Sequence, residues 1–244
     1  MKSRKFLRSG ADIAIMHVFC YNDSGEKCVC SQTKGVDALS GLMETLRAWL
    51  LGTLYLLPGL VIGFTVHECC HALAAVKLGD ATPAREGRLT LNPSAHIDPM
   101  GLLMFVLLGW GYARPVRVRP GNLRLRKWGE AIVSLAGPFS NLVLAVLFYA
   151  LWQLLPYGLW SDFLFYGCTT NVTLFALNLL PIAPLDGFAV LRLLLPARAM
   201  NFVFWMQRYG IYVLLVLSIF NVLDMYLGMA QSFALLLFGA MMGF

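Results

Sequence analysis

The stretch Phe64-Thr65-Val66-His67-Glu68-Cys69-Cys70-His71-Ala72-Leu73-Ala74 sets a His-Glu-x-x-His pattern inside apolar sequence that runs from residue 46 to about residue 78. On an α-helix successive residues turn by about 100°, so His67 and His71 lie about 40° apart on one face. Two imidazoles one turn apart can bind one zinc ion, and the carboxylate of Glu68 is left over as a base. Chance alone would produce the pattern in about one such sequence in a thousand. Because ionisable residues are costly inside a membrane-length apolar segment, the stretch predicts a zinc site within a membrane.

The composition is that of a membrane protein. The chain is 59% hydrophobic and only 13% charged, whereas soluble domains carry roughly 25% charged residues. Several apolar runs approach or exceed the ~20 residues that cross a hydrocarbon core. The net charge of +6 comes from basic residues between these runs, which fits the positive-inside rule. The sequence therefore predicts an all-α polytopic protein whose partner is the lipid bilayer, and no nucleic acid.

Four membrane-spanning helices are expected, with a fifth left open. The first is one long helix over 46–78, tilted or kinked at Pro58 and ended by Gly79-Asp80. The later apolar stretches are residues 131–155, residues 160–181 and residues 209–244. The last of these holds one span, and a second if the chain breaks around Asp224 and Gly228.

Between the first two spans, residues 80–130 carry a surplus of arginine, which predicts a cytoplasmic position. Within this region, residues 101–111 are apolar but too short to span, so they are expected to re-enter the membrane or pack on the bundle. Residues 89–91 and 115–118 have strand character, which suggests a small β segment near the mouth of the site.

The natural division is a polar N-terminal extension, residues 1–42, and one membrane domain, residues 43–244. His17, Cys20, Cys28 and Cys30 lie in the extension. Their spacing matches no common zinc module, so an ordinary tail is favoured over a metal cluster. The basic start of the tail conflicts with the expected orientation, and its side of the membrane stays open.

Catalytic zinc usually takes three protein ligands and keeps one position open. Asp186 is the favoured third ligand, because it follows a proline-broken helix end on the same side of the membrane as the end of the first helix. Asp224 is the only rival in a later apolar stretch, and it falls near the opposite side.

Zinc lowers the pKa of a bound water towards about 7, and Glu68 can take the proton and later deliver it to a leaving amine. Peptide hydrolysis also needs donors for the oxyanion. Asn178 and Asn141 are the amides available for the oxyanion or for substrate backbone. Interhelical hydrogen bonding is an equally good explanation of Asn141 and a weaker one of Asn178.

Other residues with metal-binding side chains have plainer explanations. Cys70 lies about 60° from His67 and could face the pocket, but a thiolate would close the open zinc position, so Cys69 and Cys70 are interpreted as buried apolar residues. His96 and Asp98 could form an auxiliary site, although a proline-fixed loop near the active-site mouth is favoured.

Several motifs together resemble the site-2 protease family of intramembrane zinc metalloproteases, in the compact prokaryotic form without a PDZ or CBS domain. They are His67-Glu68-x-x-His71, Gly87-Arg88-Leu89-Thr90-Leu91-Asn92-Pro93, His96-Ile97-Asp98-Pro99, Ala136-Gly137-Pro138-x-Ser140-Asn141, and Asn178-Leu179-Leu180-Pro181 leading into Pro184-Leu185-Asp186-Gly187. The resemblance implies that His67, His71 and Asp186 bind zinc, that Glu68 is the general base and acid, and that Asn178 assists substrate or oxyanion binding. It also implies cleavage of membrane proteins that carry a transmembrane helix.

The expected protein is thus an integral, multi-pass zinc metalloendopeptidase of a prokaryotic cell membrane, with one zinc per chain and its active site towards the cytoplasm. A homo-oligomer is left open. The main alternative is a catalytically silent, zinc-containing membrane binding protein, and Glu68 argues against it, because neither ligation nor packing requires a carboxylate there. An ion transporter is disfavoured because no inverted repeat is apparent.

Overall fold

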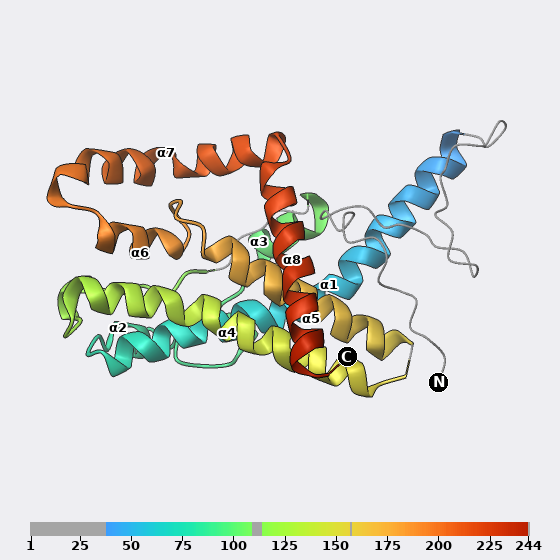
Figure 1. Ribbon diagram of the computed structural model, residues 1–244, viewed down its shortest axis with the longest axis horizontal. Helices are drawn as coiled ribbons and strands as arrows, with labels where there is room; N and C mark the ends of the chain where they lie inside the picture. Colours follow the sequence, from blue (N-terminus) through green and yellow to red (C-terminus); the bar gives the residue numbers. More distant parts are fainter. Residues whose placement is uncertain (1–37, 109–113, 157, 244) are drawn as a thin grey trace.

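The computed structural model describes residues 38–108, 114–156 and 158–243, and the regular elements in this part of the chain are helices joined by turns and irregular stretches (Figure 1). Its elements are α1 (Ala38–Lys77), α2 (Thr82–Arg85), η1 (Pro93–Ala95), α3 (Pro99–Leu108), η2 (Pro120–Asn122), α4 (Arg126–Leu154), α5 (Leu159–Asn178), α6 (Gly187–Leu194), η3 (Ala197–Ala199), α7 (Met200–Ile219) and α8 (Val222–Met241). Most of the predicted extension 1–42, including His17, Cys20, Cys28 and Cys30, lies outside the described residues.

Helices α1, α4 and α5 form the centre of the molecule and run side by side in Figure 1. The single long first helix is confirmed, with Pro58 inside α1. Helices α1 and α5 approach closely at Gly59 and Gly167, because a Cβ on Gly59 would lie 2.7 Å from the Gly167 Cα. The small residues at this crossing bring the backbones together, as they do in other membrane bundles.

Among the described helices, α1, α4, α7 and α8 are long and apolar enough to cross a membrane. This confirms the expected number of four. Helix α5, which the sequence predicts as a span, has the length but is less apolar, with Thr169, Thr170 and Asn171 buried along it. Its position explains the difference, since α1, α4 and α8 all pack on α5 and shield these polar groups from lipid.

The last part of the chain folds over this centre. Helix α6 packs on α7 through Phe188, Val203 and Met206, and α8 crosses α5 in Figure 1. The break expected around Asp224 and Gly228 is instead at Phe220 and Asn221, where Asn221 has a left-handed φ of 57°. Asn tolerates this conformation better than most residues, so it ends α7 sharply enough for α8 to form a second long helix.

The predicted small β segment is not found in the described residues. Residues 89 and 90 form a bend, and residues 91 and 115–118 are irregular and form no ladder. Their backbone and side chains instead bond to helix α1 and to neighbouring loops, as described below. The apolar stretch at 101–111 begins as helix α3, whose ten residues are too few to span a membrane.

Candidate active site

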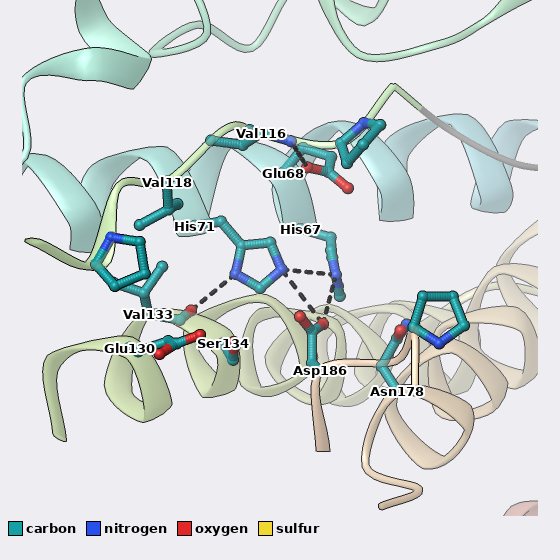
Figure 2. Close-up of a pocket in the computed structure, with 13 residues that line it drawn as sticks. His67, Glu68, His71, Val116, Val118, Glu130, Val133, Ser134, Asn178 and Asp186 are labelled. Carbon is teal, nitrogen blue, oxygen red and sulfur yellow. Dashed lines mark hydrogen bonds and ion pairs between the residues drawn. The ribbon is translucent and has the colours of Figure 1, made fainter. Parts of the chain in front are cut away.

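The structure brings His67, His71 and Asp186 together (Figure 2). The two histidines lie one turn apart on α1, and Asp186 is the residue immediately before α6. His67 Nε2 lies 3.0 Å from His71 Nε2, and Asp186 Oδ2 lies 3.1 Å from His67 Nε2 and 3.3 Å from His71 Nε2. Among the described residues, no other set of three His, Cys, Asp or Glu side chains gathers in this way.

The spacing of these three atoms fits a metal ion. Ligand atoms about 2.0–2.1 Å from one tetrahedral zinc ion lie about 3.3 Å from each other. The outer nitrogens of both rings already have acceptors, since His67 Nδ1 lies 2.6 Å from Asn141 Oδ1 and His71 Nδ1 lies 2.7 Å from Val133 O. Both Nδ1 atoms therefore carry protons, and the two Nε2 lone pairs and a carboxylate converge on one point, which calls for a cation.

Gly137 on α4 leaves room for that cation. A Cβ at this position would overlap His71 Nε2 and lie 2.7 Å from His67 Cε1. The face of α4 next to the two imidazoles is thus bare backbone.

Glu68 lies beside these residues and lines the same cavity, which has a volume of about 320 Å³ (Figure 2). The residue is only 8% exposed, and its Oε2 accepts a hydrogen bond of 2.9 Å from the backbone N–H of Val116. Val116 belongs to the irregular residues 114–119, which cover the site and hold the carboxylate in place.

The two predicted amides have different positions. Asn178 lines the cavity and donates through Nδ2 to Leu174 O, 2.9 Å away on its own helix. Because an amide nitrogen carries two hydrogens, one donor of Asn178 can still serve a ligand. Asn141 is fully buried at the Nδ1 side of His67, away from the cavity, which it does not line.

Asp80 fixes the segment that carries Val116. Its carboxylate is fully buried just beyond α1 and accepts hydrogen bonds from Thr82 Oγ1 at 2.6 Å, Arg119 N at 2.7 Å and Asn122 Nδ2 at 3.0 Å. Burial by itself raises the pKa of Asp80, but the hydrogen bonds from Arg119, Asn122 and Thr82 outweigh it and lower the pKa to about 2.

The substitution Asp80→Asn is expected to lower the free energy of unfolding by about 2 kcal/mol, because the charge-assisted hydrogen bonds are lost. Since the folded pKa lies below the unfolded one, the wild-type carboxylate contributes its stability above about pH 4 and loses it as the pH falls towards about 2. Thermal unfolding in detergent between pH 7 and pH 3 measures both effects. Asp162→Asn, at an exposed carboxylate, is the control, and an equal loss in both variants would contradict the prediction.

His96 and Asp98 do not line the cavity. His96 is fully buried and bonds through Nε2 to Thr90 O at 2.8 Å, while Asp98 caps α3 through Met100 N at 2.9 Å. The favoured interpretation as a fixed loop matches these contacts, and the backbone bond from Arg114 N to His96 O, 2.7 Å, ties the loop to the start of the covering segment. Cys69 and Cys70 are half-buried and also lie outside the cavity lining.

The backbone groups of the site could not be recognised in the sequence. Val116 N–H and Val133 C=O hold Glu68 and His71, and no sequence pattern marks a backbone group. Asn171, which is fully buried and bonded to Asn141, was not among the predicted site residues. An asparagine inside an apolar helix was the available signal.

Several curated relatives of this chain carry the name "Putative zinc metalloprotease". YwhC of Bacillus subtilis (strain 168) is 37% identical over 175 residues, which cover 68% of this chain and 80% of YwhC. Rip2 of Mycolicibacterium smegmatis is 34% identical over 67% of this chain and 66% of Rip2. Rip2 of Mycobacterium tuberculosis is 34% identical over 70% of this chain and 74% of its own length. No family model and no solved structure matches the chain.

A bundle of apolar helices that gathers two histidines, an aspartate and a separate glutamate around one cavity has the donor set of a zinc metallopeptidase. The chain belongs to the family of these relatives, the site-2 protease family of zinc metalloproteases.

Proposed function

We propose that this protein is an intramembrane zinc metalloprotease that hydrolyses peptide bonds in or near the transmembrane segments of membrane proteins. One observation carries the proposal. The three ligand atoms of His67, His71 and Asp186 lie within 3.0–3.3 Å of each other, beside Glu68, in a bundle of helices long and apolar enough to cross a membrane.

His67, His71 and Asp186 would hold the zinc ion. Zinc bound there would supply a Lewis acid and would lower the pKa of a water molecule to about 7, so that hydroxide would be available at neutral pH. The protein supplies a fixed donor set, since each histidine is held by a partner on α4 through its Nδ1 atom.

Glu68 is the proposed general base and acid. It takes the proton of the attacking water and passes it to the amine that leaves when the peptide bond breaks. The N–H of Val116 fixes one carboxylate oxygen at 2.9 Å, so the side chain is held in one orientation towards the cavity.

Asn178 is the proposed donor to the oxyanion or to the substrate backbone, because it lines the cavity and an amide can stabilise the charge that develops on the carbonyl oxygen. A helical substrate shields its own peptide bonds, so the scissile segment has to unwind before it reaches Glu68 and Asn178.

The proposed orientation places the site towards the cytoplasm of a prokaryotic cell membrane. His67 lies ten residues before Lys77, the end of α1, which is about 15 Å along the helix axis. The arginine-rich residues that follow α1 favour the cytoplasm by the positive-inside rule. Water would then enter from this nearer side.

Removal of zinc tests the proposal. The full chain, reconstituted in liposomes with a single-span peptide substrate, is expected to lose cleavage when a chelator strips the metal. About one equivalent of zinc per chain should restore cleavage, whereas magnesium should not, because it prefers oxygen ligands. Cleavage that persists in metal-free protein would contradict the mechanism, and bound zinc without any cleavage would favour a binding protein.

A further inference from the structure

Two buried asparagines form a chain of hydrogen bonds that ends on a proposed zinc ligand. Asn171 on α5 and Asn141 on α4 are both fully buried. Asn141 Nδ2 lies 3.0 Å from Asn171 Oδ1, and Asn141 Oδ1 lies 2.6 Å from His67 Nδ1. The chain links three helices, since His67 lies on α1.

The direction of this chain is fixed at its far end. Asn171 Nδ2 donates to Gly167 O at 2.8 Å and to Gly59 O at 3.3 Å. Carbonyl oxygens only accept, so the nitrogen of Asn171 has to face them and its Oδ1 has to face Asn141.

The orientation of Asn171 in turn determines that of Asn141 and the protonated nitrogen of His67. Asn141 directs its nitrogen to Asn171 Oδ1 and to Gly63 O, 3.2 Å away, which leaves its oxygen towards His67. An oxygen without hydrogen cannot donate, so His67 Nδ1 has to carry the proton. Its Nε2 is then left with a free lone pair on the side of His71 and Asp186.

Close backbone contacts make this arrangement possible. A Cβ on Gly59 would lie 2.7 Å from Gly167 Cα, and a Cβ on Gly63 would lie 2.8 Å from Asn171 Oδ1. Glycines on α1 thus let α5 come near enough for one amide group to reach carbonyls on both helices. Because both amides are fully buried, such a satisfied network has a single low-energy orientation, since reversing either amide would set oxygen against oxygen.

We infer that Asn171 is a positioning residue, which acts through Asn141 to hold His67 in the tautomer and orientation that bind zinc. This role rests on the proposed metal site. It means that zinc affinity depends in part on α5, a helix that supplies no zinc ligand.

The hydrogen-bonded chain from Asn171 through Asn141 to His67 is called the relay below. Zinc affinity in a double-mutant cycle tests it. Asn141→Leu is expected to weaken zinc binding by about 100-fold and Asn171→Leu by about 10-fold, within the range for groups that orient a metal-bound histidine. The double variant should bind zinc no more weakly than Asn141→Leu alone, because Asn171 acts only through Asn141. Thr170→Val is the matched control, since Thr170 is the buried neighbour whose Oγ1 has no hydrogen-bond partner within the described residues. Asn171→Ala adds no atoms and replaces the leucine variant if that one does not fold.

The Nδ1 protons of the two histidines give a second readout in zinc-loaded protein labelled with ¹⁵N-histidine. Asn171→Leu should shift the His67 Nδ1–H resonance and leave that of His71, which is bonded to Val133 O and not to the relay. Additive losses of affinity, equal shifts at both histidines, or unchanged affinity in Asn171→Leu would each overturn the relay while the metal site stands. A wild-type protein that binds no zinc would overturn the metal site and the relay together.

Discussion

Glu68→Gln is expected to lower the rate of peptide hydrolysis by about 10²–10⁴-fold, the usual contribution of a general base, while zinc stays bound. Glutamine has nearly the same shape and its amide oxygen can still accept the hydrogen bond from Val116 N–H. The three proposed ligands are unchanged. The measurement combines zinc content per chain with the initial rate of cleavage of a single-span substrate in liposomes.

Two further carboxylates serve as controls for this experiment. Glu44→Gln lies on the same helix at an exposed position and should leave the rate unchanged. Glu130 also lines the cavity, where it forms an ion pair with Arg192. Full activity of Glu68→Gln together with loss of activity in Glu130→Gln would assign proton transfer to Glu130 and contradict the proposed role of Glu68 as general base.

Gly137→Ala should weaken zinc binding by about 100-fold, the upper end of the range for changes next to metal ligands. The added methyl would overlap His71 Nε2 and lie 2.7 Å from His67 Cε1, so the imidazoles or helix α4 would have to move. The helix itself is expected to tolerate the substitution, since alanine is more favourable than glycine inside a helix by about 1 kcal/mol. The variant is therefore expected to stay folded and to lose metal, which zinc content and thermal unfolding report separately.

Gly41→Ala is the control for the glycine substitution. Gly41 also lies in a helix, α1, and a Cβ there would meet nothing within 4 Å. It should keep full zinc content and gain a little stability. Tight zinc binding by Gly137→Ala would contradict the prediction, because it would mean that α4 can move away from the histidines at little cost.

The sequence predicted the side chains of the site that can bind a metal, His67, His71 and Asp186. The spacing of His67 and His71 places them on one helical face whatever surrounds them, because helix geometry is local. Asp186 stood out because a carboxylate in apolar sequence needs a cationic partner. The long first helix followed from the length of its apolar run, which α1 matches.

Predictions that depended on neighbouring segments were less reliable. The prediction of strands at 89–91 and 115–118 was wrong for the described residues. The backbone N–H of Val116 bonds to the carboxylate of Glu68, and that of Arg119, just after this stretch, bonds to the carboxylate of Asp80, so neither pairs with another strand. The break between the last two helices moved to Asn221. Short segments take the hydrogen bonds that tertiary packing offers, and propensity alone cannot foresee them.

By itself, then, the sequence determined that apolar helices carry two histidines, a glutamate and an aspartate suited to zinc. Only the tertiary structure decided which atoms of these residues meet. The orientation of His67 depends on Asn141, which meets it from another helix 74 positions along the chain, and Glu68 is held by the amide of Val116, 48 positions away. Such contacts depend on how closely α1, α4 and α5 pack, and that closeness comes from glycines at the crossings, where the absence of a side chain lets the helices approach.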